Sequence, residues 1–288
     1  MINRKIGIIG CGNMGEAILS RLANVMEKST SIMVSELDSK RRDCLQDKYK
    51  MIIGTDNNKV VKFSDVIILA VKPCDFEDVL KKEVCCGISE NKLIISIAAG
   101  ITTKYIERAV GRDIPVIRAM PNIGAIIGHS VSSLSAGAYV KKSDMELARE
   151  IFSLIGDVVE VDEGLVDAVT AVSGSGPAYF FYFIESLYEV AQELKLPGEV
   201  AKKLVIKTAL GSVKLLCNLK EDPKALRKKV TSKGGTTEAA FKVLEYKKVK
   251  KIIKDAVKKA CKRSKELSKP FDKSSGFCPE QGRRTKGR

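Results

Sequence analysis

Short apolar runs alternate with amphipathic helical patterns over the first 160 residues. Each run is brief and apolar on consecutive positions, which is typical of strands buried on both faces. Between the runs, apolar residues recur at helical spacing, as at Ile18, Leu19 and Leu22. The alternation predicts an α/β fold with a doubly wound parallel sheet. The expected strands are residues 6–9, 31–35, 65–73, 93–97 and 116–120, with weaker ones at 131–135 and 158–161.

The pattern changes after Asp162, where only helical periodicity remains. Phe180, Phe183 and Leu187 fall on one helical face, and Ile252, Ile253 and Ala256 mark a last amphipathic helix. We therefore predict a dinucleotide-binding domain over 1–161, an all-α substrate and dimerisation domain over 162–269, and a disordered basic tail over 270–288. So much apolar surface on a small helical domain favours burial against a second copy of the chain.

The first predicted strand runs directly into G-x-G-x-x-G, formed by Gly10, Gly12 and Gly15, and a helix follows. Gly10 permits the tight turn, Gly12 lets a pyrophosphate approach the backbone, and Gly15 lets the helix lie close to the strand. The helix N-terminus then offers N–H groups and a positive dipole end to phosphates. This context predicts a Rossmann-type dinucleotide site.

The residues after the second strand leave the choice of nucleotide open. Glu36 stands where an acid would bind the ribose 2′-hydroxyl of NAD. Ser35 and the basic run 40–42 would instead suit the 2′-phosphate of NADP. At the carboxyl ends of later strands, Lys72 lies where ligands bind in open α/β sheets, and Ala98 and Ala99 would let a cofactor ring lie close.

Composition excludes several other classes of protein. Of the net charge of +15, +12 lies in residues 246–288, and no aromatic residues interleave with that basic helix, so we expect no nucleic-acid partner. No run approaches the apolar length of a membrane span, and no signal peptide is apparent, so we expect no membrane partner. Eight scattered cysteines without a C-x-x-C pair indicate reduced thiols and a cytoplasmic protein. One histidine, His129, argues against a metal site and a Ser-His-Asp triad.

Two glycine-rich polar segments interrupt the helical half, at residues 170–179 and 231–238. Each combines hydroxyl side chains with glycines and leads into a helix. Free N–H groups at a helix start bind anions, and hydroxyls add donors. The pair of segments predicts a site for a small carboxylate.

Five motifs together resemble the pyrroline-5-carboxylate reductase family, with similarity from about residue 5 to 268. The last two of them are specific to that family. The motifs are Ile9–Gly15, Ala70–Pro73, Val116–Asn122, Ser173–Tyr179 and Gly234–Thr237. The chain departs from the family pattern at Ile123, Gly124, Lys229 and Lys233.

The resemblance implies reduction of 1-pyrroline-5-carboxylate to L-proline with NADPH, and also with NADH, in a homodimer or a higher assembly up to a decamer. It implies a substrate site with Thr170 and Ser173 as catalytic residues and Glu163, Ser175, Gly235, Thr236 and Thr237 as binding residues. Motifs and resemblance together assign the cofactor to Ile9, Gly10, Cys11, Gly12, Asn13, Met14, Gly15, Ser35, Asn57, Ala70, Val71, Lys72, Pro73, Ala98, Ala99 and Asn122.

This chemistry suits a chain with a single histidine. A protonated cyclic imine is already electrophilic, so orientation of the hydride donor does most of the work, and Thr170 is a candidate proton relay. Two alternatives stay open. A related imine or hydroxyacid reductase would normally need a general acid such as a lysine, which is missing between Leu165 and Leu194. A non-catalytic NADP-sensing protein would not need intact substrate loops.

Overall fold

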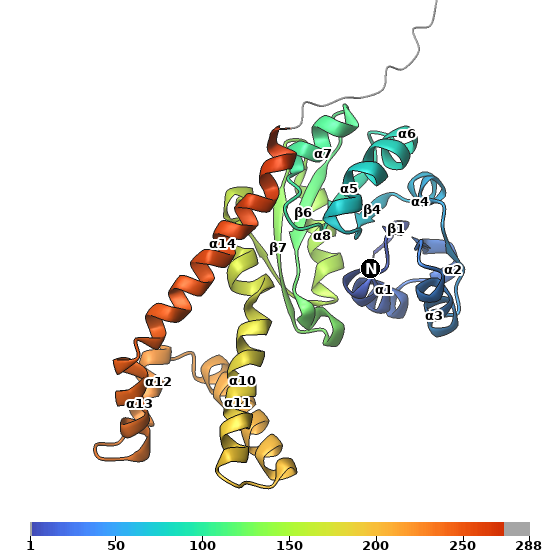
Figure 1. Cartoon of the computed structure of the whole chain (residues 1–288). Helices are drawn as coiled ribbons and strands as arrows, with labels where there is room; N and C mark the ends of the chain where they lie inside the picture. Colours follow the sequence, from blue (N-terminus) through green and yellow to red (C-terminus); the bar gives the residue numbers. More distant parts are fainter. Residues whose placement is uncertain (1, 274–288) are drawn as a thin grey trace, which may run out of the picture. The chain divides into compact units, whose positions relative to one another are not determined.

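The structure, a computed structural model, describes residues 2–273, and one sheet organises its N-terminal part (Figure 1). The eight strands within this described part lie in the order β3-β2-β1-β4-β5-β6-β7-β8. They are β1 (Ile6–Ile9), β2 (Ile32–Ser35), β3 (Ile53–Gly54), β4 (Val66–Leu69), β5 (Leu93–Ser96), β6 (Val116–Met120), β7 (Ser130–Ala136) and β8 (Gly156–Glu160).

The predicted parallel, doubly wound sheet is confirmed for the five predicted strands β1, β2, β4, β5 and β6. The two-residue strand β3, which the apolar pattern did not predict, extends the sheet by pairing parallel to β2. β7 differs, because it pairs antiparallel to β6, with Ala119 opposite Leu134, and β8 then pairs parallel to β7. The connection between β6 and β7 holds only the short 3-10 turn η2 (Ile123–Ile127). A parallel return would need a crossover of a dozen or more residues. The chain therefore reverses direction at this point.

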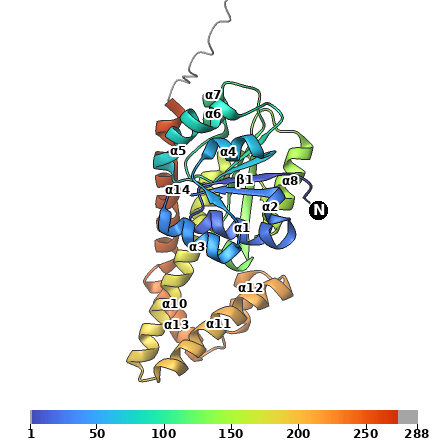
Figure 2. The ribbon, with the colours of Figure 1, turned by 90° about the vertical axis from the view of Figure 1, so that its right-hand side faces the viewer.

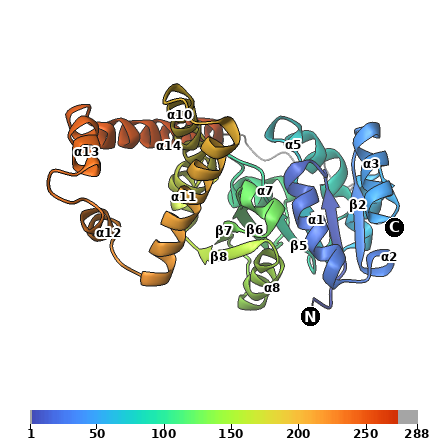
Figure 3. The ribbon, with the colours of Figure 1, turned by 90° about the horizontal axis from the view of Figure 1, so that it is seen from below.

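Helices cover both faces of the sheet, and alternating strand residues point to each of them. Ile6 and Ile8 belong to a core with α1 (Asn13–Val25), α3 (Ser39–Tyr49) and α8 (Lys142–Ser153). Ile9 belongs to a second core with α4 (Asn57–Phe63), α5 (Pro73–Val79) and α7 (Thr103–Val110). Figure 3 shows α8 beside β8, and the two pack together. The short elements are α2 (Lys28–Ser31), α6 (Cys85–Gly87), α9 (Val166–Val169), the π-helices η1 (Leu80–Val84) and η4 (Thr170–Gly174), and the 3-10 turn η3 (Glu163–Leu165).

The chain divides into two compact units. Among the described residues, the first holds 2–174 and 260–273, and the second holds 175–259. The second unit is helical and contains α10 (Gly176–Glu193), α11 (Gly198–Leu219), α12 (Pro223–Lys229), α13 (Thr236–Tyr246) and the start of α14 (Val249–Lys273). Figure 2 shows α10 and α11 joined by a short turn. No strand follows β8 in the described residues, as the periodicity predicts. The division at residue 161 stays a prediction of domain organisation.

The end of α14 corrects the expected start of the tail. The helix continues to Lys273, four residues beyond the predicted domain end at 269. Phe271 packs on Tyr105 with an edge-to-face ring contact at 5.2 Å between centroids, and it adds to the second core. The basic composition of 270–288 concealed this apolar anchor. The rest of the predicted tail lies outside the described residues.

None of the helices in residues 2–273 combines the length and apolarity needed to cross a bilayer.

Candidate functional site

The turn from β1 to α1 depends on two backbone constraints. Gly10 has φ +81°, a left-handed conformation that favours glycine, and a Cβ there would lie 2.8 Å from Val71 Cγ1. A Cβ on Gly15 would lie 2.6 Å from the carbonyl oxygen of Gly10. At Gly12, by contrast, a Cβ would meet no described protein atom within 4 Å. The turn is thus closed against the sheet and open at Gly12.

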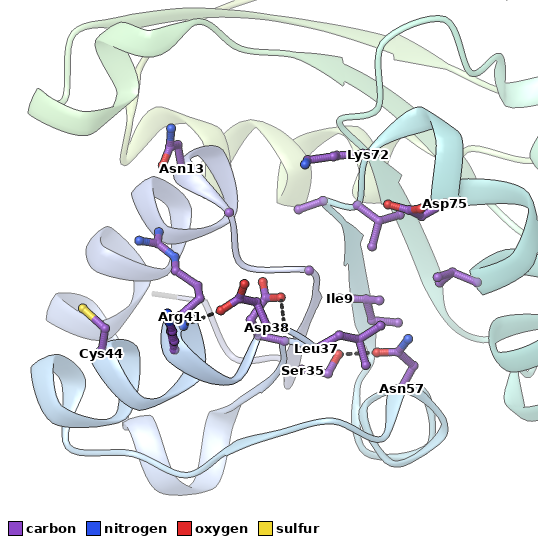
Figure 4. Close-up of a pocket in the computed structure, with 17 residues that line it drawn as sticks. Ile9, Asn13, Ser35, Leu37, Asp38, Arg41, Cys44, Asn57, Lys72 and Asp75 are labelled. Carbon is purple, nitrogen blue, oxygen red and sulfur yellow. Dashed lines mark hydrogen bonds between the residues drawn. The ribbon is translucent and has the colours of Figure 1, made fainter.

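A cavity of about 640 Å³ lies over this turn, at the carboxyl ends of β1, β2 and β4 (Figure 4). α1 begins here with Gly12 as its N-cap and no side-chain cap. The N–H groups of a helix's first turn have no acceptor within the helix. Those of Asn13 and Met14 are therefore available at the cavity edge. An elongated phosphate-bearing ligand fits this combination of volume and donors.

Nine of the predicted cofactor residues line the cavity: Ile9, Gly10, Gly12, Asn13, Ser35, Asn57, Ala70, Val71 and Lys72. The other seven predicted residues are not among those that line it. Cys11 and Gly15 shape the turn, Met14 packs on the first core, and Pro73 is the first residue of α5. Ala98 and Ala99 follow β5, and Asn122 follows β6.

Sequence reasoning did not single out Leu37, Asp38, Cys44, Asp75 and Val79, which also line the cavity. Only Asp38 carries a readable signal, because its carboxylate accepts the N–H of Arg41 at 2.8 Å and caps α3. Leu37 lies in the loop after β2, Cys44 lies on α3, and Asp75 and Val79 lie on α5, so the positions of these elements bring them to the cavity. Their residue types alone do not mark a site.

Ser35 and Asn57 form a buried pair in the cavity wall. The Ser35 hydroxyl donates to Asn57 Oδ1 at 2.5 Å. The two side chains are 1% and 3% exposed, so their mutual hydrogen bond satisfies polar groups that have left water. The pair links the end of β2 to the start of α4 (Figure 4).

Charged side chains form hydrogen bonds with the backbone of Cys11, which lies between Gly10 and Gly12 in the glycine motif. Glu36 Oε2 accepts the N–H of Cys11 at 2.7 Å, and Arg41 Nε donates to the Cys11 carbonyl at 3.0 Å. The Arg41 guanidinium is also bound to Glu16 on α1. Burial raises the pKa of the Cys11 thiol to about 12, so this cysteine stays protonated and acts as a small apolar group.

The two predicted catalytic residues lie on the π-helix η4. π-Helical turns are frequent at functional sites. The Thr170 hydroxyl donates to the Val166 carbonyl at 2.7 Å, and Ser173 Oγ accepts from Asn122 Nδ2 at 3.1 Å. Asn122 also accepts the N–H of Gly124 through Oδ1 at 3.0 Å. Asn122 therefore ties the loop after β6 to η4.

Glu163 lies in a polar cluster of the first unit. Its carboxylate accepts the Thr103 N–H at 2.8 Å and the Thr103 hydroxyl at 2.6 Å. Arg118 Nη1 lies 3.5 Å from the same carboxylate, and the Arg118 side chain is only 5% exposed. These contacts give Glu163 a structural role at the start of α7, and its assignment to the substrate stays a prediction.

The remaining predicted substrate residues belong to the second unit. Ser175 precedes α10, and Gly235 is the N-cap of α13 with no side-chain cap. Gly234 has φ +75°, and its N–H donates to Glu238 Oε2 at 3.0 Å. Since Thr236 and Thr237 open α13, their N–H groups have no acceptor within the helix.

Comparison with known proteins decides the family. Residues 163–267 match the family model described as pyrroline-5-carboxylate reductase dimerisation, and residues 5–100 match the one described as NADP oxidoreductase coenzyme F420-dependent. A pyrroline-5-carboxylate reductase of Synechocystis sp. is 41% identical over 268 residues, which is 92% of this chain and 98% of that protein. The chain belongs to the pyrroline-5-carboxylate reductase family.

Two solved structures of the same family share the fold over most of their length. The Coxiella burnetii pyrroline-5-carboxylate reductase has a TM-score of 0.84 at 35% identity, with 92% of this chain and 98% of that chain covered. The Plasmodium falciparum pyrroline carboxylate reductase, solved with NADP bound, has a TM-score of 0.84 at 30% identity, with 93% and 99% covered. The resemblance found in the motifs is thereby confirmed.

Two departures from the family pattern have a structural explanation. A Cβ on Gly124 would lie 2.4 Å from the His129 carbonyl oxygen, so the close approach of those two backbones requires glycine. Lys229 forms an ion pair with Glu221 at 2.7 Å. Ile123 is 41% exposed, and nothing in the structure explains why it or Lys233 replaces the family residue.

We expect Glu163→Ala to lower the free energy of unfolding by about 1.5–3 kcal/mol, because it removes the charged acceptor of the Thr103 hydrogen bonds and the carboxylate beside buried Arg118. Denaturant unfolding measures this, and the control Thr103→Val, which loses one hydroxyl donor, costs about 1 kcal/mol. Equal stability of Glu163→Ala and the parent would show that the cluster is not structural.

Proposed function

We propose that this chain reduces 1-pyrroline-5-carboxylate to L-proline with a reduced pyridine nucleotide. The observation that carries the proposal is the phosphate-binding turn, open at Gly12 beneath a 640 Å³ cavity, in a chain of this family. The intact glycine- and hydroxyl-rich segments at 170–179 and 231–238 support an enzyme over a nucleotide sensor.

The residues of the cavity fit a pyridine nucleotide. Gly12, where no Cβ intrudes, and the N–H groups at the start of α1 would hold the pyrophosphate. Ser35 and Asn57 hold the wall at the adenosine side, and Ala98 and Ala99 leave room for the nicotinamide after β5. A bound nicotinamide supplies the hydride that adds to the imine carbon.

The chain's own contribution to the chemistry is orientation, with a proton held near the ring nitrogen. Thr170 Oγ1 is held in place by the hydrogen bond that its hydroxyl donates to the Val166 carbonyl. When the hydroxyl rotates away from that carbonyl, it can donate a hydrogen bond to the ring nitrogen or accept one from it. Ser173 accepts a hydrogen bond from Asn122, and the two hydroxyls belong to one π-helical turn. No strong acid is needed, because the imine is protonated before reduction.

The substrate carboxylate binds at the start of α13. Thr236 and Thr237 supply backbone N–H groups, and Thr237 adds its hydroxyl, whereas Gly235, whose own N–H donates to the Ser232 carbonyl at 3.2 Å, brings the chain into the helix as its N-cap. Gly234, at φ +75°, turns the backbone so that these donors share one side. The positive dipole end of the eleven-residue helix adds to the attraction.

NADPH is the preferred nucleotide, with NADH also used. Lys40 and Arg41 line the cavity and favour a 2′-phosphate, while Glu36 at the end of β2 opposes it. The NADP-bound relative from Plasmodium falciparum supports the same preference.

The protein works as a homodimer or a higher assembly, up to a decamer. The family's dimerisation region spans 163–267. Within the second unit, Phe180 is 64%, Phe181 62% and Phe183 59% exposed, and these rings are expected to be buried in an assembly. Within the part of the chain that the structure describes, five cysteines are free thiols, which supports a reducing compartment, the cytoplasm: Cys11, Cys44, Cys74, Cys217 and Cys261.

With the purified chain, 1-pyrroline-5-carboxylate and NADPH, we expect imine-dependent loss of absorbance by the reduced nucleotide and formation of L-proline. The same assay with NADH gives a lower kcat/KM. Absence of oxidation with both nucleotides would refute the proposed reaction, and a tenfold preference for NADH would refute the proposed nucleotide.

Thr237→Val is expected to lower kcat/KM for the imine about ten- to a hundredfold, because a hydrogen bond to a charged partner contributes about 1.5–3 kcal/mol. The dissociation constant of NADPH stays within twofold, since the nucleotide lies at Gly10–Gly15. Weaker NADPH binding with an unchanged imine KM would mean that the two ligands are assigned to the wrong residues.

Light scattering at micromolar concentration should give at least twice the chain mass of 31.5 kDa. Phe181→Glu, which places a charge in the exposed aromatic cluster of α10, should shift the population toward monomer. A monomeric parent chain would contradict the proposed assembly.

A further inference from the structure

Two charged side chains of the cavity wall form hydrogen bonds with the backbone N–H and the carbonyl of Cys11. Glu36 accepts its N–H at 2.7 Å, and Arg41 Nε donates to its carbonyl at 3.0 Å. Cys11 lies between Gly10 and Gly12, whose backbones line the cavity floor. The groups that would discriminate a ribose 2′-hydroxyl from a 2′-phosphate therefore also fix the phosphate-binding turn.

Arg41 owes its position to Glu16. The Arg41 Nη2 group is bound to the Glu16 carboxylate. That carboxylate also accepts from Lys48 Nζ at 2.7 Å and from the Tyr49 hydroxyl at 3.1 Å. Burial opposes ionisation of Glu16, but the hydrogen bond from Lys48 and the charge of Arg41 together lower its pKa. Glu16 is thus a carboxylate at neutral pH, fixed by two side chains of α3 besides Arg41.

The anchored guanidinium still has donors to offer. Nε and Nη2 face the protein, whereas no bond joins Nη1 to any of the described residues 2–273. The Arg41 side chain is 29% exposed and lines the cavity with Asp38 (Figure 4). Lys40 is also a lining residue. A planar guanidinium held along one edge presents its other edge in a defined direction, which suits phosphate oxygens.

We propose that Glu16 is a positioning residue that fixes Arg41 for the 2′-phosphate of the nucleotide and thereby sets the preference for NADPH over NADH. The inference rests on the proposed nucleotide site. Glu36 disfavours a 2′-phosphate by charge, and a pre-oriented Arg41 offsets that repulsion. Without Glu16, the Arg41 side chain loses its conformational freedom only when the nucleotide binds. That entropic cost weakens the contact between Arg41 and the 2′-phosphate.

The test compares two ligands that differ by one group, adenosine 2′,5′-bisphosphate and adenosine 5′-monophosphate, by calorimetry on the full chain. We expect Glu16→Gln to weaken the bisphosphate five- to tenfold more than the monophosphate. Glu146→Gln is the matched control, because Glu146 on α8 makes an exposed ion pair with Lys142 and does not line the cavity. For Glu146→Gln, we expect the ratio of the bisphosphate affinity to the monophosphate affinity to equal that of the parent chain.

A double-mutant cycle separates positioning from a general loss of structure. In an Arg41→Met background, Glu16→Gln should leave the ratio of affinities unchanged, because the group that it positions is gone. An unchanged or increased preference for the bisphosphate in Glu16→Gln would overturn the inference, as would an equal effect in both backgrounds. These measurements involve no imine, so failure of the proposed reaction is seen separately in the activity assay.

Discussion

The contact between the start of α1 and the end of β1 is the constraint on which the site depends. Gly15 lies against the Gly10 carbonyl so closely that a Cβ would overlap it. This contact directs the first turn of α1 toward the carboxyl edge of the sheet. The neighbouring parallel strands end at the same edge, so Ser35 and Lys72 reach one cavity from distant parts of the sequence. The cavity is thus a consequence of strand order and one tight turn.

Much of this could be predicted from sequence because the governing rules are local. Apolar runs such as Ile6–Ile9 are buried strands, and glycine spacing marks the phosphate turn. The reversal at β7 escaped prediction because nothing in residues 130–136 distinguishes an antiparallel from a parallel strand. Phe271 escaped because its partner, Tyr105, is far away in sequence.

The site was predictable where backbone chemistry dominates and less so where side chains meet. Nine of the expected cofactor residues line the cavity, but the network of Glu16, Arg41 and the Cys11 carbonyl has no sequence signature. Glu163 shows the converse. The family resemblance assigns it to the substrate, while its contacts to Thr103 and Arg118 give it a structural role at the start of α7.

The central claim is that the reduced nucleotide bound in this cavity transfers a hydride directly to the imine carbon of a cyclic substrate. The most direct test is a single turnover with nucleotide deuterated at both C4 positions of the nicotinamide and 1-pyrroline-5-carboxylate. The account predicts one deuterium per proline, on the ring carbon that was the imine carbon, and none at that carbon when unlabelled nucleotide is used in D₂O. Unlabelled proline from the deuterated nucleotide, or label acquired there from solvent, would contradict it.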